Sequence, residues 1–319
     1  MSTVPSELAV EAEKKGAPAL GGAPSPARRV LSSLRGSFAV ILSVSFIAAV
    51  VLLAILAPVL VRISGWGPFD FDASAINADL GGIPLGAGGG ISAEHWFGVE
   101  PQNGRDIFAR IAYGARVSLL IAVSATLVTT IVGVVLGMAA GFYGGWVDQV
   151  ISRTMDFLMA FPSLIFMIAL LSALPAGNRP VLLVVVLSIF GWPYTARVIR
   201  GQTMSLRNRE FVEAARASGA TSRRIIFTEV LPNLRGTIIV LATLAIPGYI
   251  GTEAGLSFLG VGVMPPTPSW GQMIATSVGW YSVDPMFFVI PGTFLFLTVL
   301  SFTVFGDHLR KALDARDAA

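Results

Sequence analysis

The segment Glu210–Pro232, EFVEAARASGATSRRIIFTEVLP, is polar and rich in arginine, yet long apolar runs precede and follow it. Hydrophobic residues make up 54% of the 319-residue chain and charged residues only 13%, which is about half the share found in a soluble domain. The missing charges leave uncharged runs long enough to cross a bilayer. The segment is therefore a polar connection within an integral membrane protein.

The apolar runs predict an all-α protein with six transmembrane helices, because about 20 helical residues cross the hydrocarbon layer. The fourth and fifth runs are short and need flanking residues, and Gly251–Val263 extends the fifth. The six predicted spans are Phe38–Val61, Val117–Phe142, Met155–Leu174, Val181–Ala196, Thr237–Ile250 and Met286–Phe305.

Two patterns inside the spans bear on helix packing. Small residues four apart lie on one helix face, so Gly133, Gly137 and Gly141 predict close approach of a neighbouring helix. Proline removes a backbone donor, and such breaks persist where a neighbour or a cavity satisfies the freed carbonyl. Four prolines lie in or near spans, which favours a moving pathway over an inert anchor: Pro162, Pro193, Pro247 and Pro291.

The distribution of positive charge predicts the orientation. With the N-terminus inside, 17 of the 22 Lys and Arg residues fall in inner segments and five in outer ones. Positive residues collect on the cytoplasmic side, so both termini are expected there. The predicted organisation is a disordered tail (1–35), a first helix (36–62), an outer loop with an interfacial helix (63–116), a core (117–306) that contains a cytoplasmic loop (197–236), and a C-terminal tail (307–319).

The cytoplasmic loop predicts a helix–turn–helix. Gly219 can adopt the left-handed conformation that ends a helix, and Thr221 or Ser222 can cap a second short helix that ends before Pro232. One side of the loop is apolar and can seat in a groove of a soluble partner: Phe211, Val212, Ala215 and Ile226. An amphipathic loop held by anionic lipid is the alternative.

The order of residues in this loop resembles the coupling loop of binding-protein-dependent ABC importers, where the membrane subunit meets its ATPase. The matching residues are Glu213, Ala214, Ala215, Gly219, Leu231 and Pro232. Three further blocks resemble the C-type permease subunit of dipeptide, oligopeptide and nickel importers: 95–119, with GRDIFARIAYGARVSL; 253–271, with EAGLSFLGVG and PPTPSWG; and 306–314, GDHLRKALD. Departures include Phe97, Val99 and Glu100, where the family has Leu, Thr and Asp.

This resemblance implies a type I ABC importer permease fold in the cytoplasmic membrane of a prokaryote. It implies transport of di- or oligopeptides driven by ATP hydrolysis on other chains. The implied partners are a homologous second permease, two cytoplasmic ABC ATPases, an extracytoplasmic peptide-binding protein and membrane lipid, with no nucleic acid. No cofactor is expected in this chain, since ATP and Mg would be bound by the ATPases.

Five outer residues are candidates for contact with the binding protein or for a gate: Arg105, Asp106, Glu253, Pro266 and Trp270. Asn103 can cap a helix over Gly104–Arg116, either interfacial or solvated. The stretch 265–271 is expected to be an extended loop with Trp270 at the membrane boundary, serving as a docking lip or as a structural cap. Glu253 is either functional or paired with Arg105 or Arg116.

Several activities lack the residues they need. The chain has no G-x-x-x-x-G-K-[ST] motif, so it is not expected to bind ATP as P-loop proteins do. It has no H-E-x-x-H or G-x-S-x-G motif and no cysteine. It is therefore not expected to be an enzyme. Nickel or another small solute on the same scaffold, and an ATP-independent channel or carrier, remain alternatives.

Overall fold

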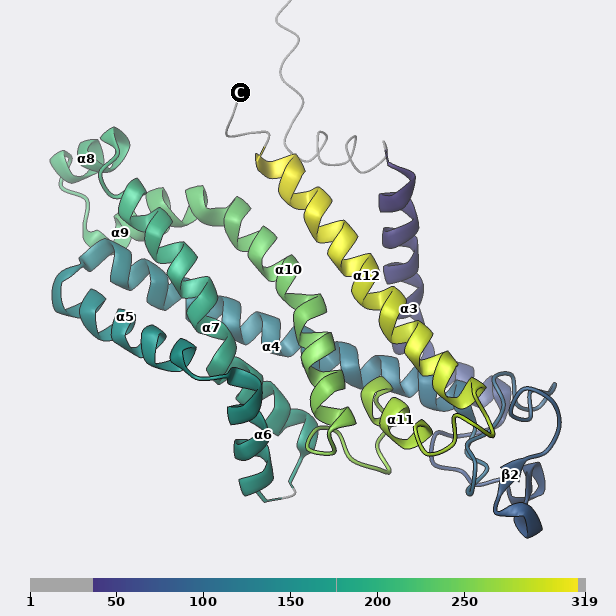
Figure 1. The fold of residues 1–319 in the computed structure, drawn as a ribbon. Helices are drawn as coiled ribbons and strands as arrows, with labels where there is room; N and C mark the ends of the chain where they lie inside the picture. The colour runs from purple at the N-terminus through teal and green to yellow at the C-terminus, as the bar shows by residue number, and fades with distance from the viewer. Residues whose placement is uncertain (1–36, 176, 315–319) are drawn as a thin grey trace, which may run out of the picture.

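The structure is a computed structural model, and it describes residues 37–175 and 177–314. This part of the chain is mostly helical (Figure 1). The long helices are α3 (Phe38–Ser64), α4 (Ile107–Tyr143), α7 (Arg179–Leu206), α10 (Leu231–Phe258) and α12 (Met286–Asp314). The shorter ones are α5 (Gly145–Ala160), α6 (Ser163–Ala173), α8 (Glu210–Ala217), α9 (Ser222–Ile225) and α11 (Trp270–Ser277). The predicted N-terminal tail, 1–35, lies outside the described residues.

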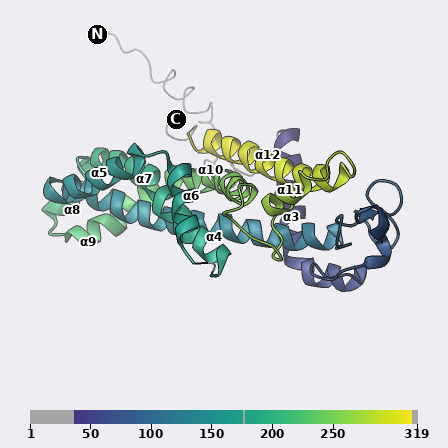
Figure 2. The same cartoon turned by 60° about the horizontal axis from the view of Figure 1, so that its bottom comes forward.

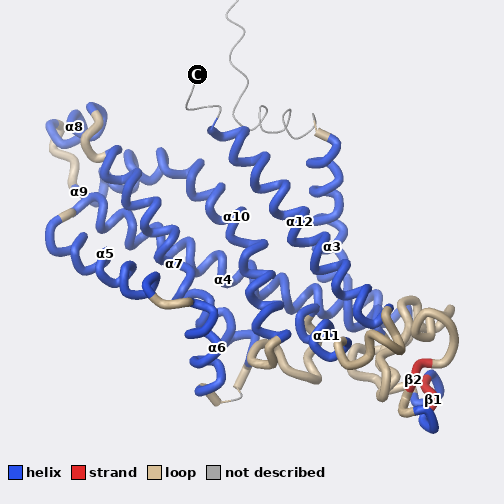
Figure 3. The backbone as a smooth tube through the Cα atoms, in the orientation of Figure 1, coloured by secondary structure: helices blue, strands red, loops and turns tan. Residues whose placement is uncertain are grey.

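The segment between α3 and α4 holds the only strands within the described ranges. It contains the 3₁₀ turns η1 (Ala73–Ala75) and η2 (Ala78–Leu80) and the antiparallel strands β1 (Ile76–Asn77) and β2 (Ile83–Pro84). Figure 3 shows long loops gathered around these strands. Figures 1 and 2 place this segment at one end of the molecule and α8 and α9 at the opposite end.

Five helices within the described residues are long and apolar enough to cross a membrane. The predicted third span, Met155–Leu174, is not one straight helix, since α5 and α6 meet at a bend of 86°. Pro162 has no backbone N–H and disfavours helical geometry at the preceding residue, so Phe161 is extended, with φ −96° and ψ 147°. The number of spans reaches six only if this bent pair is one of them.

The other spans are longer than their apolar runs. The fourth becomes α7, and the fifth becomes part of a continuous helix over Ser222–Phe258. Pro193 and Pro247 lie inside these helices and end neither of them. At the C-terminal end, α12 runs to Asp314, so the part of the expected tail that the structure describes is helical.

The glycine stripe packs α4 against α7. A Cβ on Gly137 would lie 2.6 Å from the Ala196 carbonyl oxygen, and one on Gly141 would lie 2.7 Å from the Arg200 carbonyl oxygen. A Cβ on Gly133 would lie 2.7 Å from Cβ of Thr195. The predicted close approach is therefore confirmed, and it lets two backbones meet along about two helical turns.

The start of α4 differs from the predicted one. Asp106 caps this helix by accepting a hydrogen bond from the backbone N–H of Ala109 at 2.7 Å. Asn103 instead accepts from the N–H of Arg105, so its predicted role as the cap is wrong. The helix predicted over Gly104–Arg116 is the first part of α4 and not a separate element.

Candidate functional site

The segment Glu210–Pro232 contains the predicted helix–turn–helix. Helix α8 ends in a tight turn where Gly219 has φ +79°, a left-handed conformation that glycine adopts at little cost. The side chain of Thr221 then caps α9 by accepting from the N–H of Arg224 at 3.4 Å. Of the two predicted caps, Thr221 is therefore the one used.

The apolar side of α8 packs against the chain's own helices. Val212 is fully buried, in a cluster with Phe142 of α4, Ile199 of α7 and Ile226. The prediction that Val212 and Ile226 are available to seat in a partner is therefore wrong. Helix α8 is amphipathic, and burying this face anchors it to the bundle.

The outward side of the segment carries the family-like residues. Glu213, Ala214 and Gly219 are exposed, and Ala215 is half-buried beside the cluster. The segment thus presents two exposed carboxylates, Glu210 and Glu213, and a small-residue turn on a fixed support, which is the arrangement a docking element needs.

Pro232 does not follow the end of the second short helix. Helix α9 continues through a π-helical turn, η3 (Ile226–Val230), directly into α10, and Leu231 and Pro232 form its first turn. Proline is tolerated there because the N–H it lacks belongs to the start of a helix. The segment is therefore joined to a span by unbroken helix. The π-helical turn lies at this junction, and such turns are frequent at functional sites.

Two ion pairs join α5 to α7, and no pattern in the sequence predicts them. The guanidinium of Arg200 donates to both carboxylate oxygens of Asp148 at 2.5 and 2.6 Å. Arg197 donates to Asp156 at 2.6 Å. This pair joins Asp156 of α5 to α7.

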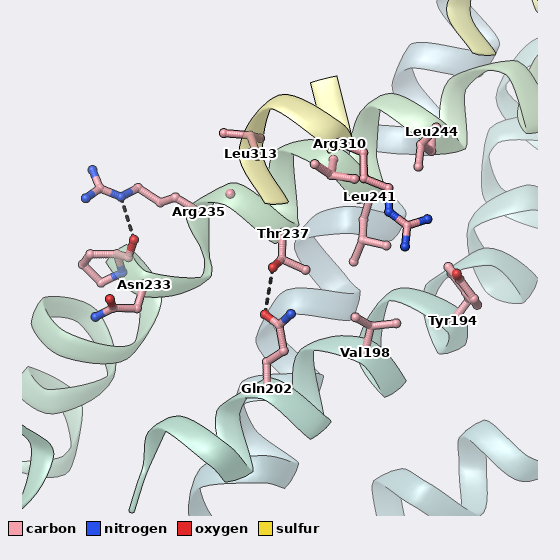
Figure 4. Close-up of a pocket in the computed structure, with 13 residues that line it drawn as sticks. Tyr194, Val198, Gln202, Asn233, Arg235, Thr237, Leu241, Leu244, Arg310 and Leu313 are labelled. Carbon is pink, nitrogen blue, oxygen red and sulfur yellow. Dashed lines mark hydrogen bonds between the residues drawn. The ribbon is translucent and has the colours of Figure 1, made fainter. Parts of the chain in front are cut away.

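A cavity of about 420 Å³ opens next to Pro232, between α7, α10 and α12 (Figure 4). A second cavity of about 390 Å³ continues from it along α7 and α10. The two share Tyr194, Leu241 and Leu244 in their walls. The sequence offered no sign of either cavity, because the lining residues are scattered over three helices.

The outer segment is held by two linked buried charge networks at the start of α4. In the first, His95 lies between two carboxylates, with Nδ1 2.9 Å from Asp106 and Nε2 3.1 Å from Asp72. Burial raises the pKa of Asp106. Hydrogen bonds from Ser74, with a further contribution from His95, lower the pKa of Asp72.

The second network centres on Glu100. Its carboxylate pairs with Arg105 at 2.7 Å and with the fully buried Arg110 at 2.5 Å. Arg110 also donates to the carbonyl oxygens of Pro68 and Pro266, at 3.1 and 3.2 Å, and to Gln272 at 2.9 Å. A buried charge is tolerated only when it is paired and hydrogen-bonded, and this pairing joins the outer segment to the loop before α11.

Glu253 is fully buried in α10, and none of the arginines in the described part of the chain pairs with its carboxylate. Its carboxylate accepts from the hydroxyls of Ser118 and Ser257 at 2.9 and 2.8 Å. Arg105 is bound to Glu100, and Arg116 is exposed. The predicted pairing of Glu253 with either arginine is therefore wrong.

Trp270 lies in the core of the bundle. It is fully buried, begins α11 and donates its indole N–H to the Ile111 carbonyl oxygen at 3.2 Å. The predicted extended loop therefore ends at Ser269, whose side chain caps α11. Of the five outer candidates only Pro266 is exposed, so the side chains of the other four face the interior.

Comparison with protein-family models gives one match. Residues 133–316 match the family described as "Binding-protein-dependent transport system inner membrane component". This range begins at the first glycine of the α4 stripe and includes the whole of Glu210–Pro232 and both cavities.

Curated relatives cover most of the chain. It is 37% identical to the oligopeptide transport system permease protein OppC of Bacillus subtilis over 85% of this chain and 83% of the relative. It is 38% identical to the dipeptide transport system permease protein DppC of Alkalihalophilus pseudofirmus, over 92% and 90%. It is 43% identical to the glutathione transport system permease protein GsiD of Escherichia coli O157:H7, over 71% and 74%.

Solved structures share the fold. A chain of the inward-facing MetNI methionine ABC transporter superposes with a TM-score of 0.51 at 18% identity, covering 64% of this chain and 96% of that one. A second crystal form gives a TM-score of 0.50 at 19% identity. At this identity the likeness concerns the helical architecture alone.

Proposed function

This chain belongs to the family of binding-protein-dependent transport system inner membrane components, and we propose that it carries di- and oligopeptides through the membrane as one subunit of an ABC importer. The observation that carries the proposal is the exposed turn between α8 and α9, which α8 fixes on the bundle and which leads through α9 into the unbroken helix Ser222–Phe258. The relatives named for oligopeptide, dipeptide and glutathione transport support peptides as the solute.

The energy comes from other chains in this proposal. Two cytoplasmic ATPases bind ATP and Mg, a homologous permease completes the pathway, and an extracytoplasmic binding protein delivers the peptide. The segment Glu210–Pro232 is the surface that meets an ATPase, with Glu213, Ala214 and Gly219 exposed to it. Both termini lie in the cytoplasm, an orientation that the distribution of Lys and Arg supports.

Coupling follows from the shape of the segment. Closure of the ATPase pair on ATP moves α8, and the buried contacts of Val212 carry that movement into α4 and α7. The unbroken helix from Ser222 to Phe258 carries it into the span that lines both cavities. The two ATPase states must bind the segment with different affinities, because a ligand that binds two conformations equally shifts neither.

The test is reconstitution of the complete transporter, with both permeases, both ATPases and the binding protein, in vesicles. We expect labelled di- or oligopeptide to accumulate only with ATP, and ATPase activity to rise when the loaded binding protein is added. Uptake that persists without ATP or without the ATPase chains would show a channel or carrier. ATP-driven uptake of a small solute but of no peptide would overturn the peptide assignment.

A further inference from the structure

The two cavities beside the segment Glu210–Pro232 form one groove along α7 and α10. The first is bounded by the start of α10 and the end of α12, and the second continues toward Tyr249 and Thr252. Polar side chains on membrane helices are expensive unless they face other protein or a wet cavity, so a polar groove on spanning helices points to a pathway. Polar groups are most numerous in the first cavity, from Tyr194, Gln202, Asn233, Arg235, Thr237 and Arg310.

The charged side chains of this groove have a single sign. Arg235 and Arg310 line the first cavity, and no charged side chain lines the second. Among the described residues that line either cavity, none is Asp, Glu or His. A wall of this kind attracts an anionic group and offers no carboxylate or imidazole ligand to a metal cation.

The two arginines are placed differently. Figure 4 shows the guanidinium of Arg310 on the cavity side, toward Tyr194, whereas that of Arg235 points away from the cavity. Arg235 donates through Nε to the Pro232 carbonyl oxygen at 2.9 Å. Arg310, near the C-terminal end of α12, also has a contact within the protein, but its guanidinium lies on the cavity side, where a solute would meet it.

A neutral donor group lies on the facing helix. The side-chain oxygen of Gln202 accepts from the hydroxyl of Thr237 at 2.8 Å, which links α7 to α10. With its oxygen engaged in that bond, the amide of Gln202 has its two N–H donors left to offer. Arg310 and Gln202 thus border one cavity from two helices, with Val198 and Leu241 as apolar wall between them.

We propose that Arg310 binds the free carboxylate of the transported solute at the end of the groove next to the segment Glu210–Pro232, with Gln202 as a second donor. This inference rests on the proposed function and narrows its solute to molecules with a free carboxylate, such as a peptide with an unblocked C-terminus. The planar guanidinium presents a fork of N–H groups that matches the two oxygens of a carboxylate, and such charge-assisted bonds are among the strongest hydrogen bonds.

The experiment compares two peptides in the complete reconstituted transporter. One has a free C-terminal carboxylate and the other is its C-terminal amide. Uptake of each is divided by the occupancy of the binding protein, measured separately, so that selection by that protein cancels. The readout is the ratio of acid to amide uptake within each variant. Arg310 already has contacts within the protein, and a ratio is insensitive to a change in the amount of folded transporter.

We expect the wild-type ratio to exceed one, and Arg310→Gln to lower it about tenfold, because a hydrogen bond to a charged group has that effect. Arg310→Lys should restore part of the ratio, because it restores the charge without the fork. Arg235→Gln is the matched control and should leave the ratio near the wild-type value. An unchanged ratio in Arg310→Gln, or an equal fall in both glutamine variants, overturns the assignment to Arg310.

A lipid phosphate could occupy the same cationic site. Vesicles of different lipid composition distinguish a lipid phosphate from a peptide carboxylate as the group that Arg310 binds. The comparison is repeated in vesicles with and without phosphatidylglycerol. We expect the effect of Arg310→Gln on the ratio to be the same in both. A loss of uptake that appears only with phosphatidylglycerol, and equally for both peptides, assigns the site to lipid and overturns the proposal. If wild-type vesicles import neither peptide, the proposed function itself fails.

Discussion

The carboxylate of Glu253 accepts a hydrogen bond from the hydroxyl of Ser118 at 2.9 Å, and this contact joins α10 to α4 inside the bundle. A second hydroxyl, that of Ser257, donates to the other carboxylate oxygen at 2.8 Å and accepts from the N–H of Val263 at 2.9 Å. One buried side chain thus connects two spans and the loop that follows α10. The end of α10 opposite to Pro232 is therefore held by these contacts, and we expect the movement of the proposed coupling to turn this helix about that end.

Replacement of Glu253 tests the importance of this connection. Glu253→Ala removes the acceptor of both serines, and we expect it to lower the free energy of unfolding by about 1–3 kcal/mol, because the buried hydroxyls lose their partner. Glu253→Gln keeps one acceptor oxygen and should lower the free energy of unfolding by less than Glu253→Ala does. Thermal unfolding of the purified chain in detergent measures both, with the exposed Glu94→Ala as control. Equal melting temperatures for Glu253→Ala and Glu94→Ala would contradict the expected role.

The glycine stripe predicts opposite effects for the same substitution at two positions. A Cβ on Gly137 meets the Ala196 carbonyl oxygen at 2.6 Å, and backbone cannot move aside easily, so Gly137→Ala should destabilise the protein by about 1–3 kcal/mol. At Gly201, on α7, no atom lies within 4 Å of the added Cβ. Gly201→Ala should stabilise α7 slightly, since alanine favours helix by about 1 kcal/mol over glycine.

Thermal unfolding in detergent also measures this pair, and the sign of the difference is the test. A rise in melting temperature for Gly137→Ala would show that the α4–α7 contact is not as close as the structure has it, and a fall for Gly201→Ala would show that Gly201 does not face open space. Both variants change one hydrogen to one methyl group, so differences in composition or charge cannot produce the result.

The buried carboxylates of the outer segment predict a dependence of stability on pH. The pKa of Asp72 lies below its usual 3.8, so its contribution is fully present above that pH and is lost as pH falls through the lower value. The pKa of Asp106 is raised, so the stability it adds grows as pH falls through that higher value. Asp72→Asn should therefore change how stability depends on pH below about pH 4, and Asp106→Asn should change that dependence above about pH 4.

Melting temperatures of wild type and both variants, recorded from about pH 3 to pH 7, give the comparison. Relative to wild type, Asp72→Asn should be less stable at neutral pH and should lose less stability at the acid end. Asp79→Asn, at an exposed position of the same segment, is the control. If the Asp72→Asn and wild-type curves run parallel over the whole range, the carboxylate of Asp72 does not contribute as described.

Much of the fold could be predicted from the sequence because its causes are local. The spacing of Gly133, Gly137 and Gly141 identified a packing face without reference to the partner helix. The turn at Gly219 was predictable because it depends only on the backbone conformation of Gly219 itself. The prolines were harder, since the helix breaks at Pro162 but continues through Pro193 and Pro247. The outcome depends on which neighbours satisfy the freed carbonyl, and that is not a local property.

The candidate sites were only partly predictable, because their contacts join residues far apart in the chain. Glu253 finds its partner Ser118 135 positions away, where no charge pattern marks it. His95 is bonded to Asp72 and Asp106 across 23 and 11 residues of irregular loop. Arg310 lines a cavity with Gln202 only because α12 and α7 border the same space from two sides. Periodicity describes a single helix, and these contacts are made between elements.

The turn at Gly219 gives the sharpest test of coupling. A β-branched residue is strained at φ +79°, so Gly219→Val should distort the turn between α8 and α9 at a local cost of about 1–2 kcal/mol. Because Val212 and Ile225 still anchor the two helices, the chain should reach the membrane in normal amounts. We expect ATPase activity to persist while peptide uptake per ATP hydrolysed falls about tenfold, since 1.4 kcal/mol corresponds to that factor.

Ser218→Val is the matched control, because Ser218 is exposed beside Gly219 but has φ −78°, which valine can adopt. It places the same side chain on the same surface without the backbone strain. Uptake and ATP hydrolysis are measured together in vesicles for both variants. If the two variants couple equally well, the left-handed turn is not needed to transmit movement. If both lose coupling, added bulk at the surface that meets the ATPase, and not backbone geometry, is the cause.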